Sequence, residues 1–181
     1  FFGALLGWIS IGFWTAVFGF FVLLRGERFA IAPRDDGPPA PIDPAARTAI
    51  VMPIYEESVS RVFAGLRAIR ESLEHAGGTA HFDFFVLSDS VDPATTTQEE
   101  LAFAQWRREA GANSGLYYRR RKIRQKRKSG NVADFCRRWG RRYRYMIVLD
   151  ADSVMSGEAL VRLVGLMERN RSEERRVGKE C

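Results

Sequence analysis

Apolar and polar positions divide the chain into three stretches, and the first is uniformly apolar. Residues 1–24 read FFGALLGWISIGFWTAVFGFFVLL and carry no charged side chain. At about 1.5 Å rise per residue, a helix of this length crosses a hydrocarbon core of about 30 Å. The hydroxyl groups of Ser10 and Thr15 can each bond back to the helix itself. The pattern predicts one transmembrane helix, with a buried core helix as the less favoured alternative.

A proline-rich stretch follows, and we expect residues 25–47 to form a linker. Five of the seven prolines lie between residues 30 and 47, a composition typical of a stiff, extended spacer. Arg25 and Arg28 come directly after the apolar stretch, and the positive-inside rule places such residues in the cytoplasm. The remainder of the chain is therefore predicted to face the cytoplasm. The start at Phe1, without a Met, indicates a chain truncated at this end.

From residue 48 short apolar runs alternate with longer amphipathic stretches. The predicted strands are 49–52, 82–87, 116–118 and 145–149, and the predicted helices are 59–76, 98–109, 131–141 and 158–168. This alternation favours βαβ units on a mostly parallel sheet, a Rossmann-like α/β domain. Asn131 is the expected N-cap of the third helix. Residues 171–181 are polar with little pattern, and we expect a foreign or disordered tail; a frayed helix end is the alternative.

Charge is concentrated in one segment. The chain has 28 Lys and Arg against 22 Asp and Glu, a net charge of +6, and eight of the basic residues fall in 119–128 (RRRKIRQKRK). As a group, Arg119–Lys126 is most simply a solvated loop or a patch for anionic lipid. The apolar, element-rich middle of the chain excludes wholesale disorder. The two cysteines give neither metal spacing nor a disulfide framework, and Cys136 is expected to be a small buried apolar residue.

Carboxylates follow three of the predicted strands, in segments 53–58, 88–93 and 150–153. In open sheets of this kind, ligands bind at the carboxyl ends of the strands. Asp150 and Asp152 are two residues apart after a strand, so their side chains point to the same side. One or two carboxylates plus substrate phosphates are a typical ligand set for a hard divalent cation. An acidic turn that caps the next helix is the alternative.

Three further features indicate a nucleotide. Lys128 precedes a glycine at a helix start, where free backbone N–H groups and a point charge suit phosphate. Asp89 can accept a hydrogen bond from a base N–H or a ribose hydroxyl. Tyr55 offers an aromatic face to a base, with core packing as the alternative, and the carboxylates beside it can accept from ribose. Together these segments describe a site for a phosphate ester with a bound cation.

Four motifs in this order resemble the processive, membrane-embedded family 2 glycosyltransferases, which have the GT-A fold. They are TAIVMPIYEE, FFVLSDS, KSGN and LDADS. Within that family, the chain is most similar to bacterial inner-membrane glucosyltransferases that build osmoregulated periplasmic glucans. The segments MPIYEE, LSDSVDP, RKSGNVADFCRRWG and YMIVLDADSVMSGEALVRLV carry this likeness, which covers roughly residues 1–170.

The resemblance implies a site and its ligands. The implied nucleotide-binding residues are Tyr55, Glu57, Asp89, Lys128 and Asp150. The implied metal, Mg²⁺ or Mn²⁺, is held by Asp152 together with Asp150. The implied reaction is inverting transfer of glucose from UDP-glucose to a glucan acceptor, with membrane lipid and an acyl carrier protein as partners and no nucleic acid.

The sequence also departs from the family. Glu56 stands where many members have Asn. The family's catalytic base, in a Thr-Glu-Asp motif, and its Gln-x-x-Arg-Trp motif lie beyond the Asp-x-Asp, and neither occurs here. We therefore expect a donor-binding half that lacks its catalytic base and does not turn over alone. The alternatives are a cellulose or hyaluronan synthase, a dolichol-type mannosyltransferase, or a membrane-tethered module that binds anionic lipid or nucleic acid.

Overall fold

The computed structural model describes residues 2–25, 42–43, 45–111 and 114–177, and the chain divides into two units, residues 1–36 and 37–181. The first unit contains helix α1 (Phe2–Arg25), of which Leu6–Arg25 is long and apolar enough to cross a membrane by length and composition. Ser10 Oγ donates to the Leu6 carbonyl at 2.7 Å, as its place in an apolar helix predicts. Most of the predicted linker lies outside the described residues.

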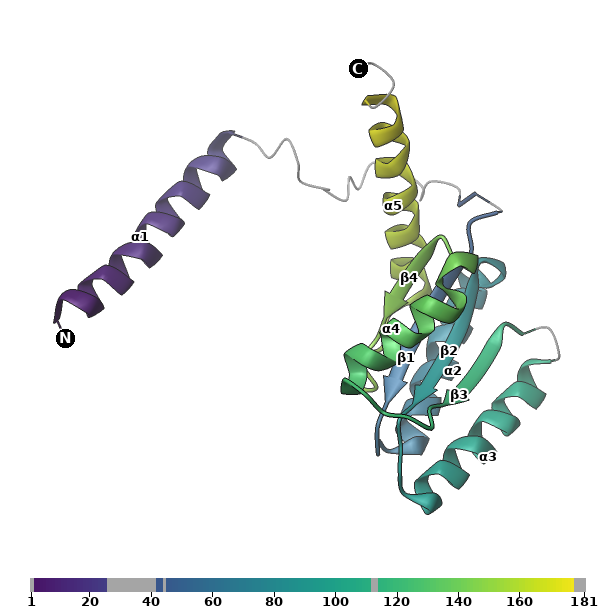
Figure 1. Ribbon diagram of the computed structural model, residues 1–181. Helices are drawn as coiled ribbons and strands as arrows, with labels where there is room; N and C mark the ends of the chain where they lie inside the picture. The colour runs from purple at the N-terminus through teal and green to yellow at the C-terminus, as the bar shows by residue number, and fades with distance from the viewer. Residues whose placement is uncertain (1, 26–41, 44, 112–113, 178–181) are drawn as a thin grey trace. The chain divides into compact units, whose positions relative to one another are not determined.

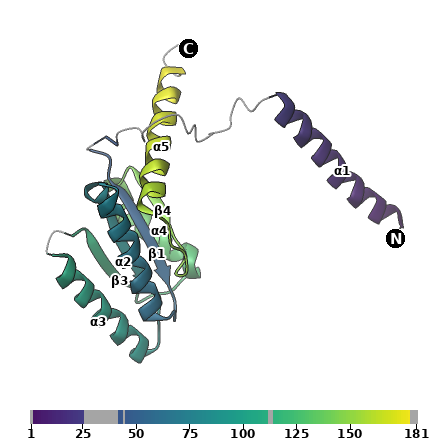
Figure 2. The ribbon, with the colours of Figure 1, turned by 180° about the vertical axis from the view of Figure 1, so that it is seen from behind.

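The second unit is a parallel sheet between two layers of helices (Figures 1 and 2). Its strand order is β3-β2-β1-β4, and every pair is parallel, which confirms the predicted sheet. The strands are β1 (Thr48–Ile54), β2 (Phe82–Ser88), β3 (Leu116–Arg120) and β4 (Tyr145–Val148). The helices are α2 (Val59–His75), α3 (Pro93–Ala110), α4 (Arg127–Trp139) and α5 (Gly157–Val177), with short 3₁₀ turns at Thr79–His81 and Gly140–Arg142.

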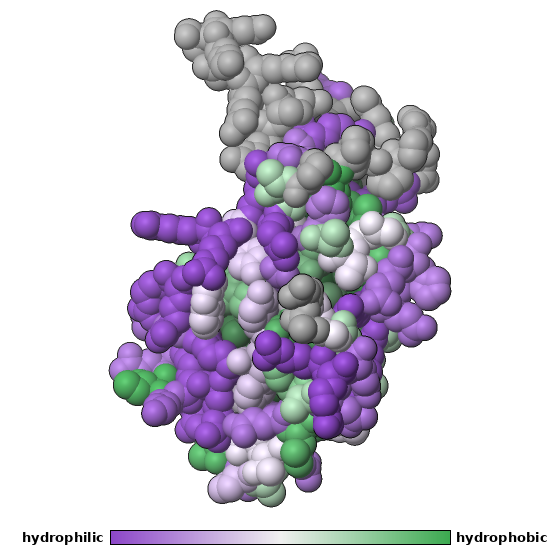
Figure 3. All heavy atoms as spheres, turned by 90° about the vertical axis from the view of Figure 1, so that its right-hand side faces the viewer, coloured by the Kyte–Doolittle hydropathy of each residue, from purple (hydrophilic) through white to green (hydrophobic). Residues whose placement is uncertain are grey.

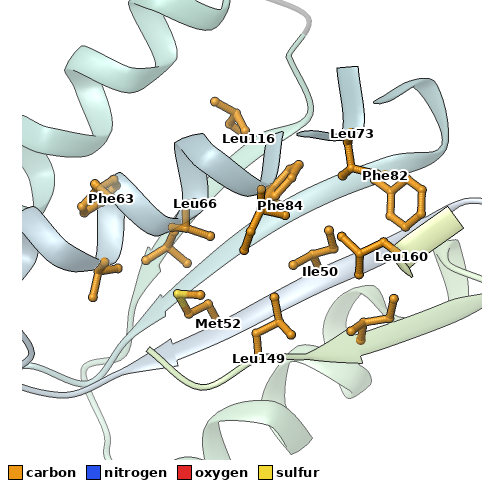
Figure 4. Packing of buried hydrophobic residues seen from close by; sticks show 14 of the residues in the cluster. Ile50, Met52, Phe63, Leu66, Leu73, Phe82, Phe84, Leu116, Leu149 and Leu160 are labelled. Atoms are coloured by element: carbon orange, nitrogen blue, oxygen red, sulfur yellow. The ribbon is translucent and has the colours of Figure 1, made fainter. Parts of the chain in front are cut away.

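The two central strands are buried along their whole length, which explains their nearly continuous apolar sequences. One face of β1 and β2 packs against α2, α3 and α5, with Met52 below Leu66 of α2 and Phe84 beside it (Figure 4). The opposite face packs against α4, where Phe85 meets Phe135 with ring centroids 4.7 Å apart. Because all strand pairs are parallel, the carboxyl ends of the strands lie at one edge of this buried sheet.

The outer strand β3 ends in charged residues, Arg119 and Arg120. Charged side chains on an edge strand oppose pairing with another chain. The molecular surface on this side is largely hydrophilic, with scattered hydrophobic residues (Figure 3).

Two expectations for α4 are wrong. The helix begins at Arg127, so Asn131 is not its N-cap; Asn131 is buried, and its Nδ2 donates to the Leu87 carbonyl at 2.9 Å. The basic segment continues into the helix, which moves the helix start four residues earlier than the capping pattern predicts. Cys136 is exposed, because α4 turns it away from the sheet contact that Phe135 makes.

Helix α5 extends to Val177, so it continues into the segment predicted as a tail. Residues 178–181 lie outside the described residues. The foreign origin of this segment stays a prediction.

Candidate functional site

A cavity of about 850 Å³ opens at the carboxyl ends of β1, β2 and β4, beside the start of α4. All six residues predicted from the sequence line it: Tyr55, Glu57, Asp89, Lys128, Asp150 and Asp152. They come from the loops after β1, β2 and β4 and from the first turn of α4, and they span nearly a hundred residues of sequence. The topology rule for parallel sheets therefore located the cavity correctly, while the role of each residue stays a prediction.

Tyr55 and Glu57 enter the cavity from the loop after β1. Tyr55 is 59% exposed, so it is not a core residue, and the packing alternative is wrong. Glu56 between them has a left-handed backbone, with φ of 52°, which is unusual for a non-glycine residue. This reversal places Tyr55 and Glu57 on the cavity wall while Glu56 turns toward the neighbouring loop.

The Glu56 side chain fastens the loop after β1 to the loop after β2. Its Oε1 accepts hydrogen bonds from the backbone N–H of Val91 at 2.6 Å and of Asp92 at 2.9 Å. The hydrogen bonds from Asp92 and Val91 lower the pKa of Glu56, so the carboxylate is ionised at neutral pH. The family resemblance marked this position as a departure, and the structure gives it a bridging role.

Asp92 has a local role. Its Oδ2 accepts from the Thr95 backbone N–H at 2.8 Å and from the Thr95 hydroxyl at 2.8 Å, which caps α3. These two hydrogen bonds lower the pKa of Asp92. Asp92 is therefore a helix cap beside the cavity, and one of its carboxylate oxygens, Oδ2, accepts both of these hydrogen bonds.

Asp89 is buried and paired with Arg121, a partner that the sequence analysis missed. The side chains of both residues are 8% exposed. Arg121 also donates to the backbone carbonyls of Gln125 at 3.1 Å and Arg127 at 3.0 Å. The guanidinium therefore holds the basic segment against the end of β2, where Asp89 reaches the cavity.

The basic segment is not a uniformly solvated loop, so that expectation is wrong for Arg119 as well as Arg121. Arg119 is partly buried, pairs with Asp134, donates to Asn131 Oδ1, and lies over the Trp139 ring at 5.5 Å. Burial of these groups is possible because each faces a carboxylate. Sequence composition could not show this, because the carboxylates that pair with Arg119 and Arg121 lie 15 and 32 positions away in the chain.

Two other arginines of the segment line the cavity. Arg124 donates from Nη2 to the Ser90 carbonyl at 2.9 Å, and Arg127 lies at the first turn of α4. Arg120, Lys122 and Lys126 remain exposed. The segment thus supplies cations both to the cavity and to the surrounding surface.

The start of α4 has an unusual backbone. Lys126 and Arg127 are both left-handed, with φ of 59° and 45°, and such positions concentrate at functional sites. A Cβ at Gly130 would clash with the carbonyl oxygen of Gln125, so only glycine allows the basic segment to fold this closely onto the helix. This close approach places Lys128 at the cavity.

Lys128 Nζ forms an ion pair with Asp150, and both side chains are more than half exposed. Asp152 is exposed in the turn after β4. Among the residues that the structure describes, no three His, Cys, Asp or Glu side chains gather as a metal site. Two carboxylates nevertheless fit a cation such as Mg²⁺, because its remaining ligands are commonly substrate phosphates and water.

Comparison with known proteins decides the family. The family model described as "Glycosyl transferase family 2" matches residues 49–173, which contain the whole cavity. The chain belongs to glycosyl transferase family 2. The family assignment agrees with the four motifs that the sequence presents in order.

Curated relatives are similar over most of this chain. Proteins named "Glucans biosynthesis glucosyltransferase H" are 60% identical over 168 residues in Ralstonia nicotianae and 56% identical over 169 residues in Cupriavidus pinatubonensis. A third, from Salmonella typhimurium, is 52% identical over 170 residues. These matches cover 92–93% of this chain, which spans about a fifth of the length of the relatives.

A solved mannosyltransferase structure shares the architecture. The "Mannosyltransferase PcManGT from Pyrobaculum calidifontis in complex with GDP-Man and Mn2+" superposes with a TM-score of 0.54 at 15% identity. The match covers 88% of this chain and 43% of that chain. At this identity the likeness shows the fold, and it confirms the predicted GT-A-like class.

Proposed function

We propose that this chain binds the donor in a membrane-anchored, inverting glucosyltransferase, which transfers glucose from UDP-glucose to a growing β-glucan in osmoregulated periplasmic glucan synthesis. The names of the curated relatives support the reaction. The observation that carries the proposal is the cavity: the side chains predicted from the sequence for base, ribose, phosphate and metal line one space. Its volume lies within the roughly 300–1,000 Å³ of typical small-molecule sites.

The distribution of charge around the cavity supports a diphosphate ligand. Arg124, Arg127 and Lys128 supply positive charge from the basic segment, and Asp150 and Asp152 supply negative charge from the turn after β4. In the proposed complex Lys128 faces the diphosphate and exchanges its ion pair with Asp150 for the phosphate oxygens. Asp152, with Asp150, would hold Mg²⁺ or Mn²⁺, which neutralises charge on the leaving diphosphate.

The nucleoside end of the donor is proposed to lie between the loops after β1 and β2. The exposed Tyr55 ring offers a face for uracil, and the exposed Glu57 carboxylate offers an acceptor for ribose hydroxyl groups. Asp89 keeps lone pairs beyond the two that Arg121 uses, so it can still accept from the base. Asp89 therefore presents an acceptor at this end, while Arg121 stands behind it and donates to Asp89 and to the basic segment.

The cellular setting belongs to the same proposal. Helix α1 would anchor the protein in the bacterial inner membrane, with the second unit in the cytoplasm, where sugar nucleotides are available. Membrane lipid, the glucan acceptor and an acyl carrier protein are the proposed partners.

Nucleotide selectivity tests the proposal. The 181-residue chain in detergent, with Mg²⁺ present, is titrated calorimetrically with UDP, UDP-glucose and GDP-mannose, and separately with heparin at 50 and 300 mM salt. We expect UDP and UDP-glucose to bind at least about tenfold more tightly than GDP-mannose, which corresponds to about 1.4 kcal/mol. Binding of heparin alone, lost at the higher salt, would instead support the polyanion-binding module.

A further inference from the structure

Glu99 is a buried carboxylate just behind the wall of the cavity. It lies on α3, is 1% exposed, and is not among the lining residues. Its Oε1 accepts from the Ser90 hydroxyl at 2.6 Å, and its Oε2 accepts from the Tyr118 hydroxyl at 2.8 Å. An acidic group is costly to bury, and these two hydroxyl donors offset part of that cost. Packing alone does not explain why a carboxylate is buried at this position.

The hydrogen bond to Glu99 fixes the direction of the Ser90 hydroxyl. A serine hydroxyl has one proton, and here it is donated to Glu99. The lone pairs of Ser90 Oγ are then free to accept, and they receive the backbone N–H of Glu56 at 3.0 Å. Ser90 is fully buried, so water cannot substitute for either partner. Glu99 therefore sets the orientation in which the Ser90 hydroxyl accepts a hydrogen bond from the backbone of the neighbouring loop.

Ser90 joins two segments that both line the cavity, the loop after β1 and the basic segment. Its hydroxyl holds Glu56, the left-handed residue between Tyr55 and Glu57. Its backbone carbonyl accepts from Arg124 of the basic segment at 2.9 Å. A shift of Ser90 would thus move the proposed base and ribose contacts together with one of the cavity cations.

We infer that Glu99 is a positioning residue, which acts through Ser90 to hold the Tyr55–Glu57 loop in the conformation that receives a nucleoside diphosphate. The inference rests on the proposed function, since it concerns the same cavity. Glu99 touches no ligand in this account. Its effect travels through one hydrogen bond to Ser90 and a second to the Glu56 N–H.

Tyr118 provides a matched control. It donates to the other oxygen of the same carboxylate, and burial together with the hydrogen bond to Glu99 raises the pKa of Tyr118, so its hydroxyl stays protonated. Tyr118→Phe removes one hydrogen bond from Glu99 and leaves the bond to Ser90 in place. Ser90→Ala removes the acceptor of the Glu56 N–H, and Glu99→Met removes the carboxylate that orients this acceptor. A merely structural carboxylate would make these variants alike.

Binding of UDP with Mg²⁺ to the full chain in detergent is the first readout. We expect Ser90→Ala and Glu99→Met to raise the Kd for UDP about tenfold, the loss typical when a residue that orients a ligand-binding group is removed. Tyr118→Phe should change the Kd less than twofold. Adding Glu99→Met to Ser90→Ala should cause no further loss, because both act on one path. Glu99→Gln, whose amide oxygen can still accept from Ser90, should restore most of the affinity. Equal Kd changes in all single variants, or additive losses in the double variant, would overturn the inference.

Hydrogen exchange of the chain without nucleotide is the second readout, and it does not depend on what the cavity binds. The amides of Glu56, Val91 and Asp92 should exchange faster in Ser90→Ala and Glu99→Met, and at the wild-type rate in Tyr118→Phe. If Glu99→Met does not fold, Ser90→Ala against Tyr118→Phe gives the same comparison. If the wild-type chain fails to bind UDP but the variants show these exchange differences, the proposed function is refuted and the positioning role remains. Unchanged exchange at these amides would refute the positioning role.

Discussion

The carboxylate of Asp89 receives two hydrogen bonds from the guanidinium of Arg121, from Nε to Oδ1 at 2.7 Å and from Nη2 to Oδ2 at 2.5 Å. Asp89 follows β2 and Arg121 follows β3, so the pair joins the ends of two adjacent strands. The same guanidinium holds the carbonyls of Gln125 and Arg127. The basic segment therefore folds around one buried ion pair, and that fold places Lys128 in the cavity.

Loss of this pair should destabilise the protein. Asp89→Asn leaves the Arg121 guanidinium buried without a compensating charge, and breaking a buried pair in this way costs about 3–5 kcal/mol. Because Asn keeps one acceptor oxygen, we expect the lower end of that range. Chemical denaturation measured by circular dichroism checks it. Arg120→Gln, at an exposed site on the end of β3, is the control and should change the free energy of unfolding by less than about 0.5 kcal/mol. Equal stability of the two variants would show that Asp89 is not a structural anchor.

Gly130→Ala should weaken UDP binding although alanine is the better helix former. The methyl group would clash with the Gln125 carbonyl and push the basic segment away from α4. Intrinsic propensity alone would favour alanine by about 1 kcal/mol. Gly140→Ala is the matched control just beyond the other end of α4, because its Cβ would lie 3.6 Å from Cys136 Cβ, an ordinary contact. Calorimetry should show at least a tenfold loss, about 1.4 kcal/mol, for Gly130→Ala alone. A Gly130→Ala chain that binds UDP as tightly as the control would show that the close approach is unimportant.

The elements of the sheet could be predicted because burial on both faces leaves a plain signal in the sequence. FDFFVL has no alternation, and only a strand covered on both sides accepts so many apolar residues in a row. The position of the cavity followed from topology, because the carboxyl ends of parallel strands lie at one edge. Tyr55, Asp89 and Asp152 could therefore be placed together without a structure.

The partners within the site could not be predicted in this way. The pairing of Arg121 with Asp89 joins residues 32 positions apart, and nothing local separates Arg121 from its basic neighbours. The left-handed backbone of Glu56 and Lys126 depends on hydrogen bonds and packing from other segments, because neither residue type favours it. Asn131 has the sequence context of a cap, but α4 begins four residues earlier, and this places Asn131 inside the helix and against β2.

Stability at acid pH should depend on Asp134. Burial alone would raise the pKa of Asp134, but hydrogen bonds from Arg137 and Arg138 and the charge of Arg119 outweigh it and lower the pKa to about 2. A carboxylate with a lowered folded-state pKa stabilises the protein above its unfolded pKa of 3.8, and this contribution is lost as the pH falls toward about 2. The free energy of unfolding of wild type minus that of Asp134→Asn should be largest above pH 4 and shrink between pH 4 and 2. A difference that is constant across this range would contradict the lowered pKa.

The central claim is that Asp152 and a diphosphate share one divalent cation, and calorimetry of UDP binding tests it most directly. The full chain in detergent is titrated with UDP in Mg²⁺ and again in chelator, beside Asp152→Ala and the control Glu158→Gln, whose exposed side chain lies in the first turn of α5. In wild type and the control, we expect Mg²⁺ to tighten UDP binding by about 1–3 kcal/mol. Asp152→Ala should abolish that difference. Equal UDP affinity with Mg²⁺ and with chelator in the wild-type chain would contradict the account and leave Asp150 and Asp152 as an acidic turn.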